Sequence, residues 1–126
     1  DLQNPSFEIL PEQKPLYHAL CVLAGNFSIL LWEKAFTDFQ TKLGLPPEAL
    51  ASFLEQTFRN LAIHTPANLN NTDVFDVAKT LQKKTVLTGP LVRGDQITIH
   101  KNLVSLTGDP YQEVYESFIH AFEKSR

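Results

Sequence analysis

The chain has 126 residues, 43% of them hydrophobic, and its 11 basic and 14 acidic side chains give a net charge of −3. This composition is typical of one small globular domain and excludes a disordered or fibrous protein. Without a basic excess, nucleic acid is not expected as a partner. The single cysteine, Cys21, excludes an internal disulfide and a cysteine-based zinc site. Its apolar neighbourhood predicts a small core residue, and a reducing, cytoplasmic setting is the default expectation.

The first residues are typical of a linker. The chain begins at Asp1, contains no methionine, and has no charged-then-apolar leader. We therefore expect a piece of a longer polypeptide; a processed mature protein is the alternative. Residues 1–14 are rich in proline and predict the exit from a preceding domain, with a short strand over Ser6–Leu10. A helical domain is then expected over residues 15–126.

The most apolar part of the chain follows at once. Nearly every side chain over residues 16–32 is apolar or aromatic, and Gly44 ends the pattern. One helix is predicted from about Pro15 to Lys42, about 40 Å long. A small helical domain cannot cover such a helix alone, so we expect another copy of the chain or a missing domain as its partner. A membrane span is the alternative, disfavoured by His18 and Asn26 in a short apolar core.

Four more helices are predicted after the long one. Pro46-Pro47 begins the second, which reaches about His64, and a polar loop over Thr65–Asn71 follows. Thr72 or Asp73 caps a third helix that extends to Leu81. The prediction is therefore an all-α fold, a multi-helix bundle around one long apolar N-terminal helix.

The last two helices have clear start signals. Gly94-Asp95 opens the fourth, and Asp109-Pro110 opens the fifth. On the fourth, the residues expected to face inward are Ile97, His100, Leu103 and Val104. On the fifth, the apolar side chains at helical spacing are Tyr111, Val114, Tyr115, Phe118, Ile119 and Phe122.

Several kinds of chemistry have no motif in this chain. Its five glycines build no dinucleotide-binding or phosphate-binding loop, and it contains no HExxH, metal-ligand spacing or G-x-S-x-G. We therefore expect this chain itself to bind no cofactor and no metal. His18 lies one turn before Cys21 and could activate its thiolate, but a cysteine inside an apolar helix is usually inert.

The long helix carries the first candidate site. His18 and Gly25 are seven residues apart, so they are predicted to lie on nearly the same face, with Asn26 beside them. A polar stripe on an apolar helix needs partners or a cavity. In a cleft, His18 would donate or accept a proton and Asn26 would hydrogen-bond the substrate. The alternative is a satisfied core histidine with a close helix contact at Gly25.

The second candidate site is the loop from Thr88 to Asp95. Gly89, Pro90 and Gly94 predict a tight irregular turn, and Asp95 can cap the next helix. Arg93 stands at a helix entrance, where a cation needs an anionic partner. Two interpretations remain open. Either Arg93 binds a substrate carboxylate or phosphate, or it pairs with a surface carboxylate in a rigid turn.

Four strings in the sequence occur together in a known family. They are Leu16-Tyr17-His18-Ala19, Leu23-Ala24-Gly25-Asn26-Phe27, Leu87-Thr88-Gly89-Pro90 and Arg93-Gly94-Asp95. This combination resembles the C-terminal helical domain called domain of unknown function 2520, from about residue 7 to the end. Gly25 stands where the family often has a serine. That domain follows a Rossmann domain in proteins similar to pyrroline-5-carboxylate reductase and ketopantoate reductase.

The resemblance implies a fold like the C-terminal domain of 6-phosphogluconate dehydrogenase, which forms the dimer and lines the cleft facing the nicotinamide. By that analogy His18 is catalytic and Asn26 faces the substrate, while Thr88, Gly89, Arg93 and Asp95 lie near the cleft or the dimer contact. The expected partners are a second copy and the N-terminal Rossmann domain of the same parent chain, with no membrane.

The expected function is then that of a dimerisation and substrate-cleft domain in an NAD(P)-dependent oxidoreductase acting on a small carbonyl or imine. NAD(P) is expected in the parent protein, so the chain alone would not turn over. A non-enzymatic helical interaction module is the competing hypothesis, and a parent with a degenerate nucleotide site that acts as a sensor is a third.

Overall fold

The computed structural model describes residues 7–63, 81 and 87–126, and within these ranges the regular structure is helical, without a strand. The predicted all-α, multi-helix fold with a long N-terminal helix is thereby confirmed. The strand expected over Ser6–Leu10 is not formed by its described residues, Phe7–Leu10. The chain divides into two compact units, Asp1–Arg59 and Asn60–Arg126.

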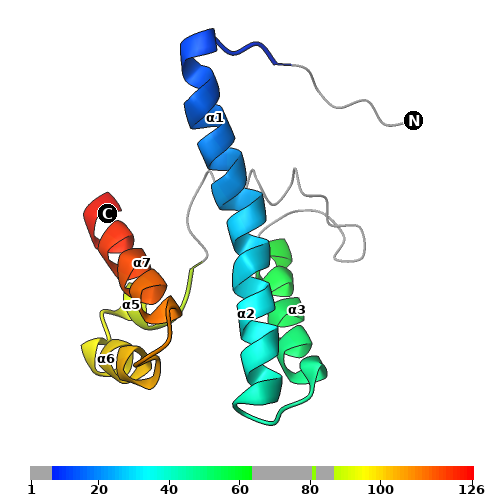
Figure 1. Cartoon of the computed structure of the whole chain (residues 1–126), viewed down its shortest axis with the longest axis vertical. Coiled ribbons are helices and arrows are strands. Elements are labelled where there is room, and N and C mark those ends of the chain that lie inside the picture. The colour runs from blue at the N-terminus through cyan, green and yellow to red at the C-terminus, as the bar shows by residue number, and fades with distance from the viewer. Residues whose placement is uncertain (1–6, 64–80, 82–86) are drawn as a thin grey trace. The chain divides into compact units, whose positions relative to one another are not determined.

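The first unit is dominated by one continuous helix, drawn from blue to cyan in Figure 1. It begins with the 3-10 turn η1 (Pro11–Gln13) and continues through α1 (Lys14–Cys21), the π-turn η2 (Val22–Asn26) and α2 (Phe27–Thr41). The helix predicted over Pro15–Lys42 is confirmed.

The C-terminal end of this helix depends on one glycine. Gly44 has a φ of +64°, the left-handed conformation that glycine adopts without a steric penalty. The chain turns there, and the Leu45 N–H returns to the carbonyl of Phe39 at 2.8 Å.

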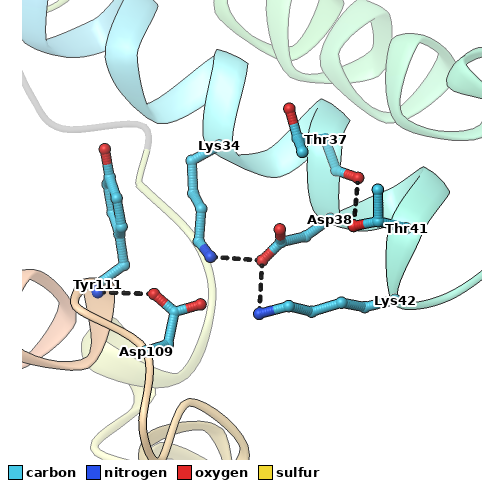
Figure 2. Close-up of polar contacts among 7 residues, drawn as sticks. All are labelled: Lys34, Thr37, Asp38, Thr41, Lys42, Asp109 and Tyr111. Atoms are coloured by element: carbon cyan, nitrogen blue, oxygen red, sulfur yellow. Dashed lines mark hydrogen bonds and ion pairs between the residues drawn. The ribbon is translucent and has the colours of Figure 1, made fainter.

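The second half of the helix carries its charged side. Lys34 Nζ lies 2.5 Å and Lys42 Nζ 3.3 Å from Asp38 Oδ2, both at helical i, i+4 spacing (Figure 2). The hydrogen bond from Lys34, followed by that from Lys42, holds the pKa of Asp38 below its ordinary value despite partial desolvation. The ion pairs described for the long helix therefore lie at the C-terminal end of α2.

Helix α3 (Pro47–Ile63) follows the turn, with a proline at its start as predicted. Leu50 is buried, at 7% exposure, and Leu54 is half-buried one turn later. His64, the polar loop over Thr65–Asn71 and the third helix lie outside the described residues, apart from Leu81, which is helical.

The second unit contains the short helix α5 (Pro90–Arg93), then α6 (Gln96–Ser105) and α7 (Tyr111–Ser125), with α6 contacting both of the others. Asp109 accepts a hydrogen bond from the Tyr111 N–H at 2.8 Å (Figure 2), which fits the predicted start of the last helix. Gln112 Nε2 donates to the Leu103 carbonyl at 2.7 Å and ties α7 to α6.

The face of α6 that turns inward differs from the predicted one. Ile99 is 5% exposed and Leu103 is half-buried, but Ile97 and Val104 are 71% and 54% exposed, and His100 is exposed as well. The physical reason lies in the contact with α7. Asn102 Nδ2 donates to the Tyr115 hydroxyl at 2.9 Å, which turns the face of Ile99 and Asn102 toward α7.

Asp95 caps α6, as the sequence predicts. Its Oδ1 accepts from the Thr98 N–H at 3.1 Å and its Oδ2 accepts from the Thr98 hydroxyl at 2.7 Å. These Thr98 hydrogen bonds, with a smaller contribution from Arg93, hold the pKa of Asp95 below its ordinary value.

Replacement of Asp95 by alanine should lower the midpoint of thermal unfolding by a few degrees, because two Thr98 donors lose their acceptor. Asp95→Asn keeps an acceptor oxygen, so its midpoint of thermal unfolding should fall less than that of Asp95→Ala. Because folding lowers the pKa of Asp95, the aspartate's advantage is present above the unfolded pKa and lost as pH falls through the folded value. Calorimetry of the three proteins at pH 7 and about pH 2 checks this. An Asp95→Ala deficit that is equal at both pH values would contradict it.

Candidate functional site

The first candidate site lies at the π-turn of the long helix. The Phe27 N–H bonds to the carbonyl of Val22, five residues back instead of four. A π-turn holds about one residue more than an α-turn, so everything beyond it is set back by about 100° around the axis. Such turns inside α-helices occur frequently at functional sites.

This turn changes which polar residue shares the face of His18. In an unbroken α-helix Gly25 would lie about 20° from His18 and Asn26 about 80° from it. With the extra residue, Asn26 moves to about 20° or less and Gly25 moves away. The prediction that His18 and Gly25 share a face is therefore wrong, because it assumed regular α-helical spacing. Asn26 lies on the face of His18 instead.

Both polar residues are exposed and lie within an uncovered apolar surface. We call this the apolar surface, defined by eight large side chains that are each 41–63% exposed: Leu16, Tyr17, Leu20, Leu23, Phe27, Ile29, Leu30 and Trp32. None of the residues of α1, the π-turn or α2 is buried. The expectation that this domain cannot cover its own long helix stays a prediction.

Because the long helix is exposed, the predictions for Cys21 and His18 also change. Cys21, predicted as a core residue, is exposed on the uncovered helix. His18 is likewise not a satisfied core histidine in this chain, because its side chain is open to solvent. By length and composition alone, the helix Pro11–Thr41 also passes as a membrane span, with a mean hydropathy of 1.4 in its most apolar window. The buried core helix of a soluble protein and a signal sequence near the N-terminus pass the same test.

The second candidate site is built from α5 and the glycines at its two ends. Gly89 (φ +98°) precedes the helix and Gly94 (φ +66°) follows it, and both conformations favour glycine. The Asp95 N–H closes the turn on the Pro90 carbonyl at 2.9 Å. Sequence reasoning expected this segment to be an irregular loop and missed the single helical turn that Pro90 begins.

The side chains of this turn differ in their exposure and in their hydrogen bonds. Arg93 Nη2 lies 3.7 Å from Asp95 Oδ2, but its side chain remains 60% exposed. Asp95 is engaged with Thr98 on both oxygens. Thr88 is exposed. The carboxylate partner foreseen for Arg93 is thus Asp95, while most of the guanidinium remains open to a further anion.

We compared the described residues with the features of dinucleotide and metal sites. Four glycines have a positive φ: Gly44, Gly89 and Gly94 lie at helix ends, and Gly108 lies in the turn between α6 and α7, so none of them is in a phosphate-binding loop between a strand and a helix. Among the described residues no group of three His, Cys, Asp or Glu side chains could hold a metal ion. The two polar groups, His18 with Asn26 and Arg93 with its turn, belong to different units, so each is treated as a site of its own.

Comparison with known families agrees with the sequence resemblance. The family model described as Domain of unknown function (DUF2520) matches residues 1–121. Neither a curated protein nor a solved structure matches the chain. The matched range includes the long helix with its π-turn and the turn around Arg93. The chain therefore belongs to the DUF2520 family.

Proposed function

We propose that this chain is the helical dimerisation and substrate-cleft domain of an NAD(P)-dependent oxidoreductase that acts on a small carbonyl or imine. By itself it is inactive, and it works with a Rossmann domain of the same parent chain. The observation that carries the proposal is the uncovered apolar surface of the long helix, which needs a partner to be removed from water.

The extent of the apolar surface suits a second copy of the chain. The eight large apolar side chains, each about half exposed, are distributed around the helix, because successive residues are about 100° apart. Exposed apolar patches on monomers rarely exceed a few hundred Å², so this helix favours association. A second copy presents the same surface, so a twofold arrangement covers both at once.

The oxidoreductase part of the proposal follows from the family resemblance. The sequence has no dinucleotide-binding motif, so NAD(P) is assigned to the Rossmann domain. What this chain supplies is polar groups within an apolar surface. The imidazole of His18 can both donate and accept a proton, and the Asn26 amide can orient a carbonyl oxygen.

The turn around Arg93 supplies the anion contact in this proposal. Its guanidinium is 60% exposed, and a fork of N–H donors suits a carboxylate or a phosphate. Thr88 and Gly89 lead into the turn, and Asp95 fixes its end through Thr98. The exposed thiol of Cys21 suits a reducing, cytoplasmic setting.

A helical interaction module that is not an enzyme is the alternative. The same exposed apolar helix favours it, because such a surface also accepts an amphipathic helix of another protein. The two proposals differ in symmetry. A dimerisation domain associates with itself, while an interaction module remains a monomer until its target is added.

Self-association is the first test. Sedimentation equilibrium of the 126-residue chain should give twice its mass of 14.2 kDa. Leu20→Glu, on the apolar surface, should raise the dimer Kd about 100-fold, because it places an unpaired charge in the interface. Ile97→Glu is the matched control, since Ile97 is 71% exposed on α6 and should leave the dimer intact. If the chain still sediments as a monomer at about 100 μM, the dimer is weaker than typical stable dimers, and the result would contradict dimerisation.

Catalysis is tested in the intact parent protein with a substrate found by screening small carbonyl compounds for NAD(P)H oxidation. His18→Ala should lower kcat/KM by about 10²-fold to 10⁴-fold if the imidazole transfers a proton. His100→Ala, at an exposed position of α6, is the control and should have no effect. An unchanged kcat/KM in His18→Ala would remove His18 from any catalytic role.

A further inference from the structure

The π-turn aligns the polar residues of the two halves of the long helix. With its extra residue, six exposed side chains lie in a stripe about 60° wide around the axis, whereas an unbroken α-helix would spread them over about 140°. We call these side chains the polar stripe: Lys14, His18, Asn26, Glu33, Thr37 and Gln40. The turn therefore gives the whole helix one continuous side that suits contact with water.

The side opposite the polar stripe is mainly apolar, and its burial differs between the two halves of the helix. Over α2, Leu31, Ala35 and Phe39 lie on this side and are half-buried. Over α1 and the π-turn the same side carries three leucines that are 55–63% exposed and lie about 140–160° around the axis from His18. We call them the leucine ridge: Leu16, Leu20 and Leu23. The side that is partly covered over α2 thus continues over α1 without cover from the described residues.

The leucine ridge is complementary to itself. Leu16 lies four residues before Leu20, and Leu23 lies three residues after it, which is the alternating spacing of helix contacts in coiled coils. In an antiparallel pair with Leu20 at the twofold axis, Leu16 of each copy lies beside Leu23 of the other. The sequence has no Asp, Glu, Lys or Arg between Lys14 and Glu33, so two ridges meet without repulsion between like charges.

We infer that a second copy docks on the leucine ridge as an antiparallel, twofold pair, and that the polar stripe of each copy stays in water. The inference rests on the proposed function, because it requires the dimer, and it names the side of the helix that forms the contact. It leaves His18 and Asn26 uncovered by the partner helix, as a substrate cleft on that side requires.

Charge substitutions on the two sides of the helix test the contact. Leu20→Glu, in the leucine ridge, should raise the dimer Kd about 100-fold. Leu30→Glu adds the same charge about 20° around the axis from His18 and should change Kd less than about threefold. The two leucines are similarly exposed, at 55% and 46%. Sedimentation equilibrium measures Kd, and circular dichroism verifies that both variants are helical. An equal loss of affinity in both variants would overturn the leucine ridge as the contact.

Cross-linking tests the antiparallel pairing. In a chain that carries Cys21→Ser, Leu20→Cys places the one thiol at the twofold axis, and mild oxidation should link two copies by a disulfide. His18→Cys in the same background lies about 160° around the axis and should not link them. Equal linking by both variants, or no link at position 20 while the dimer is intact, would overturn the pairing. A wild-type chain that stays monomeric would instead contradict the proposed function.

Discussion

The proposed assembly depends on one feature, the long apolar helix, in which no described side chain is buried. In the described residues the buried hydrophobic side chains are Leu50 and Ile99, and both lie outside the long helix. The hydrophobic effect scales with the area removed from water, so covering this helix would add stabilisation. We therefore propose that the chain works as one part of an assembly.

The π-turn is the second feature on which the candidate site depends. A single extra residue between Cys21 and Phe27 turns the two halves of the helix relative to each other. It separates Gly25 from the face of His18 and brings Asn26 there. His18 and Asn26 thereby lie on one face of the helix, and no side chain lies within 4 Å of the position that a Cβ on Gly25 would take.

The parts of the fold that sequence predicts well are those set by local chemistry. Gly44 ends the long helix through its left-handed backbone, Pro47 begins α3, and Asp95 caps α6. Each acts within one turn of its own position, so the signal is visible in the residue type. The candidate residues His18 and Arg93 were found in the same way, as a polar residue in an apolar run and a cation beside a glycine turn.

Other features depend on contacts that residue types do not specify. The inward face of α6 is set by the bond between Asn102 and Tyr115, thirteen residues apart, and the competing stripe of Ile97 and Val104 is equally apolar in sequence. A π-turn has no residue signature of its own; Gly25-Asn26, two weak helix formers inside an apolar run, is the only hint of it. Cys21 looked like a core residue because its neighbours are apolar, yet those neighbours are uncovered themselves.

The most direct test of the uncovered helix is hydrogen exchange of the chain at a series of protein concentrations. If a second copy covers the apolar surface, amide protection over residues 16–32 rises with concentration as the dimer forms, and protection in α6 and α7 stays constant. Exchange over residues 16–32 that is rapid at every concentration would contradict self-association. That result would favour the alternative, a helical interaction module that binds another protein.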